Sequence, residues 1–130
     1  QALGRIASGG ELSRISLAIQ VVTAQTSATP TMVFDEVDVG IGGATAEVIG
    51  NLLQSLGNKG QVLCVTHQPQ VASKGHHHLY VSKQTSKNSV STQLEQLTEC
   101  DKIEEIARML GGIDITDQSR AHAKEMLAVH

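Results

Sequence analysis

The feature that most constrains the fold is a short apolar run, Thr31 to Phe34, that leads directly into three acids. Asp35 and Glu36 are adjacent, and Asp38 follows at once. An apolar run of this length between turn signals is typical of a buried strand. Carboxylates at the tip of a buried strand are costly unless a partner such as a cation compensates them. One carboxylate on a metal beside another that polarises a water suits phosphoanhydride hydrolysis. A strand followed by a polar turn with an aspartate cap explains this stretch equally well.

A helix and a second strand follow the acidic stretch. Apolar residues recur at helical spacing before residue 57, and 61–66 is another apolar run. Strand, helix and strand at this length predict a parallel βαβ unit, whose strand tips share one edge of the sheet. We therefore expect His67 to lie near Asp35 and Glu36, although it also suits a cap of the Gln68-Pro69 turn. The residues expected on the buried helix face are Ile49, Leu52, Leu53 and Leu56.

The first segment contains a helix start with glycines. Ser8 and Glu11 have the spacing of a capping box, and the predicted helix runs to about Gln25. Gly9 and Gly10 lie in its first turn, where glycine is a poor helix former. Glycines at a helix N-terminus let a ligand approach the backbone, whose free amides attract phosphate. Taken alone, this short motif favours an ordinary helix cap over a phosphate site.

The second half predicts an antiparallel hairpin followed by helices. Strands are expected at 78–83 and 89–97, joined by a polar turn at 84–88. Three histidines occupy 76–78, immediately before the hairpin. Adjacent side chains on an extended segment point to opposite faces, so one metal cannot easily bind all three. We expect these histidines to form a solvated strand start.

Two helices are predicted to close the chain. Apolar residues at helical spacing over 103–110 predict the first, which ends at the glycine pair 111–112. Thr116 or Asp117 is expected to cap the second helix. The residues expected on its apolar face are Ala123, Met126 and Leu127.

Composition fits a globular domain of one core. Hydrophobic residues make up 40% of the 130 residues and charged residues 18%. The net charge of −3 provides no basic field for nucleic acid. Cys64 and Cys100 show no metal spacing, so we expect buried reduced thiols in a cytoplasmic protein. No apolar run approaches the ~20 residues of a membrane span, so no membrane partner is expected. The chain begins with Gln1, close to a motif, and is expected to be part of something longer.

Four motifs carry a resemblance to a known family. Residues 7–11 (ASGGE) resemble the LSGGQ signature of ABC-type ATPases, and residues 32–36 (MVFDE) resemble their Walker B strand. Residues 37–38 (VD) resemble the D-loop and residues 65–67 (VTH) the H-loop. The motifs occur in the family's order, which makes the combined signal specific. The forms ASGGELSR, DEVDVGIGG and IARMLGG…AHAKEML look like the RecN family, the SMC-like bacterial ATPases of DNA double-strand-break repair, over essentially the whole chain.

The resemblance implies an α/β ATPase head that uses ATP and Mg²⁺. Asp35 would hold Mg²⁺ through water, Glu36 would be the general base, and His67 would contact the γ-phosphate. The remaining motif residues would act across a dimer of heads, either on ATP held by the opposite subunit or at the interface. They are Ser8, Gly9, Gly10, Glu11 and Asp38. Two departures are Ala7, where the signature usually has Leu, and Glu11, where it often has Gln, although Glu is common in SMC-like proteins. The polar Thr31 also weakens the Walker B match slightly.

A larger departure is the missing phosphate-binding loop. The sequence contains no G-x-x-x-x-G-K-[ST], the Walker A pattern. In SMC-like proteins that loop lies in an N-terminal lobe beyond a long coiled coil. Residues 1–130 are therefore expected to be the C-terminal lobe of a split head, inactive alone. The implied partners are its own N-terminal lobe, a second head, and DNA through an intact protein associated with the nucleoid.

Two other functions compete with this interpretation. The lobe would be a docking or dimerisation module without chemistry, although such a surface needs neither Glu36 nor His67. Direct DNA binding by the lobe is the weakest option, because the net charge is −3 and the sequence has no basic, aromatic-rich stripe, although Lys83 and Lys87 could touch a phosphate backbone.

Overall fold

The computed structural model describes residues 18–20, 22–23, 26, 30–36, 38–111 and 113–128. The chain divides into two compact units, Gln1–Lys74 and Gly75–His130. The first described residues, 18–20, 22–23 and 26, are helical and fall within or next to the first predicted helix, whose start at Ser8 lies outside the described residues. Among the described residues, no helix is both long and apolar enough to cross a bilayer.

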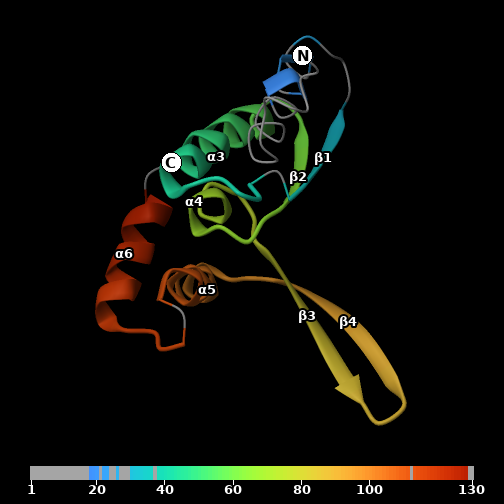
Figure 1. Cartoon of the computed structure of the whole chain (residues 1–130), viewed down its shortest axis with the longest axis vertical. Coiled ribbons are helices and arrows are strands. Elements are labelled where there is room, and N and C mark those ends of the chain that lie inside the picture. Colours follow the sequence, from blue (N-terminus) through green and yellow to red (C-terminus); the bar gives the residue numbers. More distant parts are fainter. Residues whose placement is uncertain are drawn as a thin grey trace, which may run out of the picture. The chain divides into compact units, whose positions relative to one another are not determined.

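From residue 30 onward, the described part of the first unit is the predicted βαβ arrangement followed by a short helix. Its elements are β1 (Thr31–Asp35), α3 (Gly43–Gly57), β2 (Gln61–Val65) and α4 (Pro69–Ala72). The strands pair in parallel, from Thr31 opposite Gln61 to Asp35 opposite Val65. The helix α3 connects the strands and packs against β2 (Figure 1). The parallel βαβ prediction is therefore confirmed.

One face of the two-stranded sheet forms the core with α3. Alternation along β1 and β2 turns Phe34, Met32 and Cys64 toward the helix. The other core residues come mainly from α3, with two from flanking segments: Ile41, Ala46, Ile49, Leu53, Leu56 and Val71. Three of the four predicted helix positions are buried. Leu52 is 38% exposed, because it lies at the margin of the stripe that contacts the sheet, so that prediction was wrong.

The opposite face of the same sheet is exposed. Val33, Leu63 and Val65 are 66%, 44% and 55% exposed. The prediction of a fully buried strand was therefore wrong for this face, because the core that the described residues form lies on the other side of β1 and β2. The strand β2 ends at Val65, one residue before the predicted end at Thr66.

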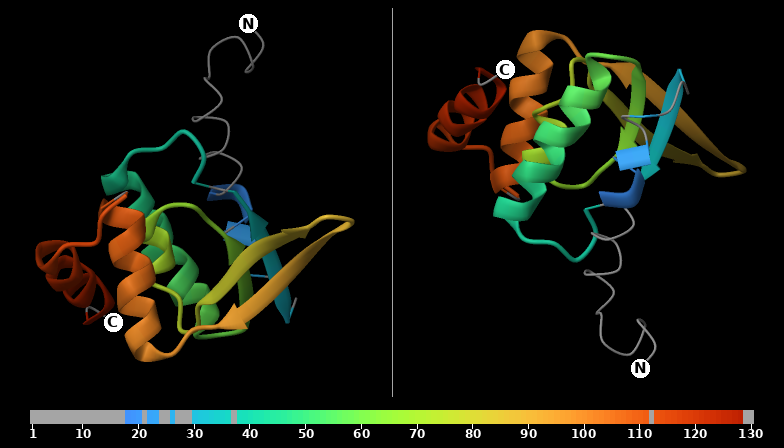
Figure 2. Two further views of the ribbon diagram at one scale, coloured as in Figure 1. Left: turned by 90° about the horizontal axis from the view of Figure 1, so that it is seen from below. Right: turned by 90° about the horizontal axis from the view of Figure 1, so that it is seen from above.

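The second unit begins with a hairpin of β3 (Leu79–Ser86) and β4 (Ser89–Gln96), seen as a long ribbon in Figure 2. The strands are antiparallel, and a two-residue turn at 87–88 joins them. The predicted turn at 84–88 was wrong, because 84–86 pair with 89–91 and continue β3. Both strands are largely solvated, so polar side chains are tolerated within them.

Two helices, α5 (Glu99–Gly111) and α6 (Asp117–Ala128), pack against each other (Figure 2). Ile106, Ala107 and Ala123 are fully buried, in agreement with the predicted faces. The Thr116 hydroxyl accepts a 3.0 Å hydrogen bond from the Ser119 amide, which identifies Thr116 as the cap of α6. Cys100 is exposed in the first turn of α5, so its predicted burial was wrong.

Candidate active site

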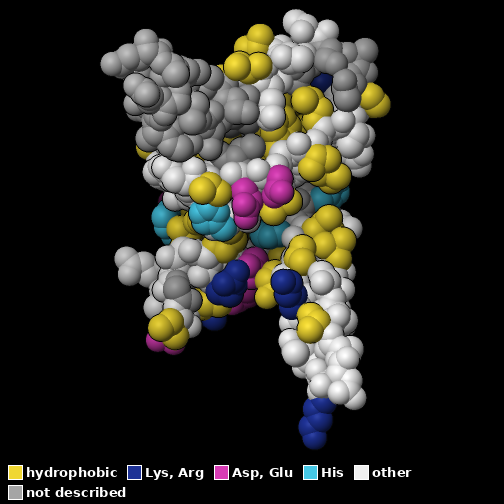
Figure 3. Space-filling model, turned by 45° about the vertical axis from the view of Figure 1, so that its right-hand side comes forward, with side chains coloured by type: hydrophobic (Ala, Val, Ile, Leu, Met, Phe, Trp, Pro, Cys, Tyr) yellow, Lys and Arg dark blue, Asp and Glu magenta, His cyan; other side chains and the backbone are white. Residues whose placement is uncertain are grey.

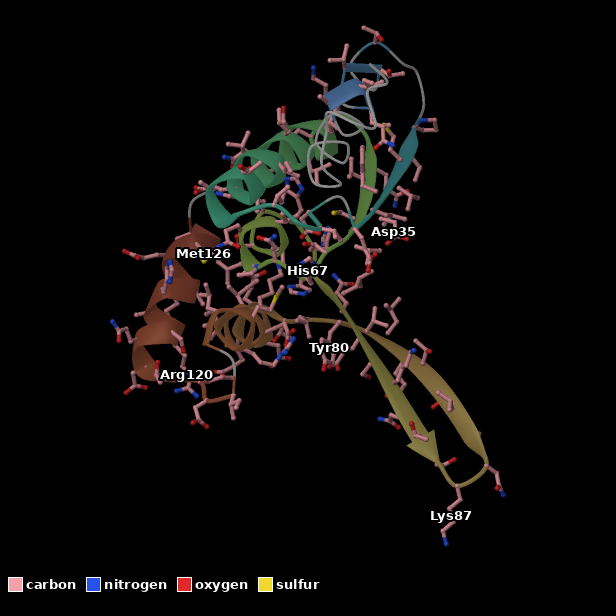
Figure 4. The ribbon with its side chains drawn as sticks, in the orientation of Figure 1. Asp35, His67, Tyr80, Lys87, Arg120 and Met126 are labelled. Atoms are coloured by element: carbon pink, nitrogen blue, oxygen red, sulfur yellow. The ribbon has the colours of Figure 1, made fainter. Side chains whose placement is uncertain are left out.

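The acids and the histidine singled out in the sequence lie at one edge of the parallel sheet. Asp35 pairs with Val65, and the Glu36 amide donates a 3.0 Å hydrogen bond to the Val65 carbonyl. His67 comes two residues after Val65, beyond the end of β2. Figure 4 shows Asp35 and His67 at the adjoining ends of the two strands. The short parallel ladder therefore brings these three residues to a common edge.

Both acids at the tip of β1 face solvent. Asp35 and Glu36 are exposed, so water compensates their charges. The sequence argument that a buried acid pair requires a cation was therefore wrong for the described chain. Glu36 has a φ of 53°, in the left-handed region that is uncommon for residues other than glycine. The side chain thus follows a sharp turn at the end of the strand.

Asp38 is the buried acid of this edge. Its side chain is 0% exposed, and its Oδ2 accepts a hydrogen bond from the Thr66 hydroxyl. Its Oδ1 lies 3.6 Å from Nδ1 of His67, whose side chain is 64% exposed. This distance is an electrostatic contact and is too long for a hydrogen bond. The Asp38 carboxylate therefore faces one side of the imidazole and leaves the other side open to solvent.

Gln68 joins the same loops through its side chain. Its Nε2 donates to the carbonyl oxygens of Asp38 at 3.0 Å and Ile41 at 2.8 Å. Its backbone amide donates to the Thr66 hydroxyl at 3.1 Å. The alternative role of His67 as the cap of the following turn was wrong, because the Thr66 hydroxyl caps it instead. Sequence reasoning missed Thr66 and Gln68, whose contacts span about thirty positions along the chain.

Cys64 lies directly behind this edge, on the inner side of β2. Burial, together with the negative charges of Asp38 and Asp35, raises the pKa of its thiol to about 11. A thiol in this environment stays protonated near neutral pH. Cys64 therefore acts as a packing residue beside the acids.

Curated proteins match nearly the whole length of this chain. No protein-family model matches the chain. The DNA repair protein RecN of Vibrio cholerae is 58% identical over 127 residues, which are 98% of this chain and 23% of that protein. The RecN of Haemophilus influenzae is 56% identical over 127 residues, with the same coverage of both chains. This chain belongs to the RecN family. It spans less than a quarter of the length of these curated relatives.

The fold of this RecN-family chain also matches solved structures. A structure from work on ATP-driven dimerization and DNA stimulated activation of SMC ATPases superimposes with a TM-score of 0.65. The match covers 85% of this chain and 66% of that chain, at 14% identity. At this identity the similarity concerns the fold. The predicted ATPase-head fold class is therefore confirmed.

Some of the residues predicted to act at the site of this RecN-family chain remain predictions. The signature residues Ser8, Gly9, Gly10 and Glu11 lie outside the described residues. Asp38 was predicted to act across a dimer interface, and the structure describes its contacts within one chain.

The prediction that the three histidines at 76–78 are solvated holds for two of them. His76 and His77 are exposed, as predicted, whereas His78 is partly buried and its Nδ1 has no hydrogen-bond partner in the described part of the chain. Across the described part of the chain, no three His, Cys, Asp or Glu side chains are placed to hold a metal ion. A metal at the acidic edge would therefore need further ligands such as water or phosphate oxygens.

Proposed function

We propose that this chain is the C-terminal lobe of the ATP-hydrolysing head of a RecN-family DNA repair protein. The observation that carries the proposal is the parallel register of β1 and β2, which ends with Asp35 beside Val65. That register brings Asp35, Glu36 and His67 to one edge. A pair of carboxylates and an imidazole at the carboxyl ends of parallel strands suits the binding and hydrolysis of a nucleotide.

Each residue has a distinct role in this proposal. Asp35 holds Mg²⁺ through water, because carboxylate oxygens and retained waters are the ligands that Mg²⁺ prefers. Glu36 is the general base that orients and deprotonates the attacking water. His67 contacts the γ-phosphate through the side of its ring that faces away from Asp38. The exposure of Asp35, Glu36 and His67 supports these roles, because each is open to a ligand.

The proposed partners are the N-terminal lobe of the same protein and a second head. The exposed apolar face of the sheet, formed by Val33, Leu63 and Val65, supports the first partner, since covering it would complete the core of the head. The structural match to SMC ATPases, which were studied for ATP-driven dimerization, supports the second. In the dimer, Ser8, Gly9, Gly10, Glu11 and Asp38 of one head would approach the ATP of the other. DNA would act through the intact protein.

Substitution of Glu36 in the full-length protein tests this function. We expect Glu36→Gln to lower ATP turnover by about a hundredfold or more while ATP binding persists, because the base is lost and the fold is kept. The nucleotide-bound dimer should also last longer. Glu47→Gln is the matched control, since Glu47 is exposed on α3. Turnover by Glu36→Gln at the rate of the control would contradict the proposal.

The 130-residue chain alone is expected to hydrolyse ATP negligibly, because its sequence lacks the Walker A pattern. Mixing it with the N-terminal lobe should restore turnover. Turnover by the lone chain that Glu36→Gln abolishes would refute this expectation.

A docking lobe without chemistry is the second candidate, favoured by the same exposed apolar face. It predicts that Glu36→Gln leaves turnover of the full-length protein unchanged, while a charged substitution at Leu63 prevents assembly with the N-terminal lobe.

A further inference from the structure

The Asp38 side chain is buried at the sheet edge where Asp35 and His67 lie. A buried carboxylate loses its hydration, which costs several kcal/mol unless hydrogen bonds replace it. Among the described residues, Asp38 receives one such bond, from Thr66, and its Oδ1 has only the 3.6 Å approach of His67. This incomplete compensation favours movement of Asp38 into water. Other contacts must therefore hold its loop in place.

Gln68 supplies contacts of the required kind. A side-chain amide has two donor hydrogens, and Nε2 of Gln68 directs them to the carbonyls of Asp38 and Ile41. These carbonyls begin and end the 38–41 loop, which also contains the bond from the Ile41 amide to the Asp38 carbonyl. Ile41 is anchored in the core. Gln68, which follows β2, therefore holds the loop after β1 through two hydrogen bonds.

We propose that Gln68 is a positioning residue of this site, which clamps the 38–41 loop so that Asp38 stays buried against Thr66 and His67. The proposal rests on the proposed ATP hydrolysis. Its consequence is that the two loops move as one body, with Asp38 fixing the orientation of the His67 ring. His67 is then held ready for the phosphate, and less entropy is lost when the reacting groups align.

The test is Gln68→Met in the full-length protein, because Met keeps the approximate length of the side chain and removes both donors. We expect kcat for ATP to fall by about tenfold. The KM for ATP should stay within about twofold, since Gln68 does not itself bind nucleotide in this proposal. Gln54→Met is the matched control. Nε2 of Gln54 also donates to a backbone carbonyl, that of Lys74 at 3.0 Å, which lies outside the 38–41 loop.

A second measurement follows the clamp without ATP turnover. Hydrogen exchange of the full-length protein should become faster at the amides of Val39 and Ile41 in Gln68→Met, and stay unchanged there in Gln54→Met. Equal kcat and equal exchange in the two variants would overturn the role of Gln68. If Glu36→Gln hydrolyses ATP normally, the proposed function fails. Faster exchange in Gln68→Met would still support the clamp, and unchanged exchange would overturn it.

Discussion

The carboxylate of Asp38 accepts a hydrogen bond from the hydroxyl of Thr66 and so joins the loops that follow the two parallel strands. Thr66→Val keeps the shape of the side chain and removes the donor. We expect it to lower the free energy of unfolding by about 1–3 kcal/mol, because a buried carboxylate loses its hydrogen bond. Denaturant unfolding measures this change. Thr31→Val is the control, since its hydroxyl bonds the exposed Gln61 side chain, and equal losses would contradict the expectation.

The close approach of α3 and α4 depends on Gly50. A Cβ at this position would lie 2.8 Å from the Gln70 carbonyl oxygen and 3.3 Å from Cα of Val71. We expect Gly50→Ala to destabilise the protein by about 1–3 kcal/mol, because backbone atoms must shift. Gly42→Ala is the control, since no atom lies within 4 Å of the added methyl. Thermal unfolding that does not distinguish the two variants would exclude this close contact.

The two cysteines should differ sharply in reactivity. The pKa of Cys64 is raised to about 11, chiefly by burial, whereas Cys100 is exposed. At pH 8 only about one Cys64 thiol in a thousand is ionised, so alkylation of Cys64 should be slow until the protein unfolds. Cys100 should react first. Mass spectrometry of peptides after brief alkylation checks the order, and the Cys100→Ser variant isolates the slow site.

Partial burial of His78 predicts a pH dependence of stability. Burial lowers the pKa of its ring below the ordinary value of 6.5, while Glu105 opposes that shift and Lys102 adds to it. The unfolded chain therefore binds the proton more readily than the folded chain, and stability falls as pH drops below about 6.5. We expect His78→Leu to lose less stability than the parent between about pH 7 and pH 5. His76→Gln, at an exposed position, should keep the slope of the parent.

The sequence predicted the elements of this fold well where apolar periodicity was strong. β1, β2 and α3 follow from apolar runs and helical spacing, and the common edge of Asp35 and His67 follows from parallel pairing. The turn of the hairpin was misplaced because Gln84 and Ser86 are polar yet paired, and a solvated two-stranded ribbon imposes no hydrophobic pattern at its tip. Hydrophobic side chains stand at the surface of this ribbon in Figure 3.

The hydrogen bonds that organise the candidate site could not be predicted from local sequence patterns. Asp38 was identified as an acid of the edge, but its burial depends on Thr66 and Gln68, which lie 28 and 30 positions away. No periodicity or short motif encodes a contact at that separation. Exposure of Cys100 was missed for a similar reason, because the side of α5 that faces the rest of its unit is set by tertiary packing.

The left-handed backbone conformation of Glu36 lowers the stability of the fold, and the sequence nevertheless has glutamate there. Glycine adopts a φ of 53° without steric penalty, whereas glutamate pays about 1 kcal/mol for it. A residue chosen for foldability alone would be glycine or asparagine. The carboxylate thus occupies a backbone position that disfavours it, so a substitution of Glu36 by glycine should stabilise the fold whatever it does to the proposed hydrolysis.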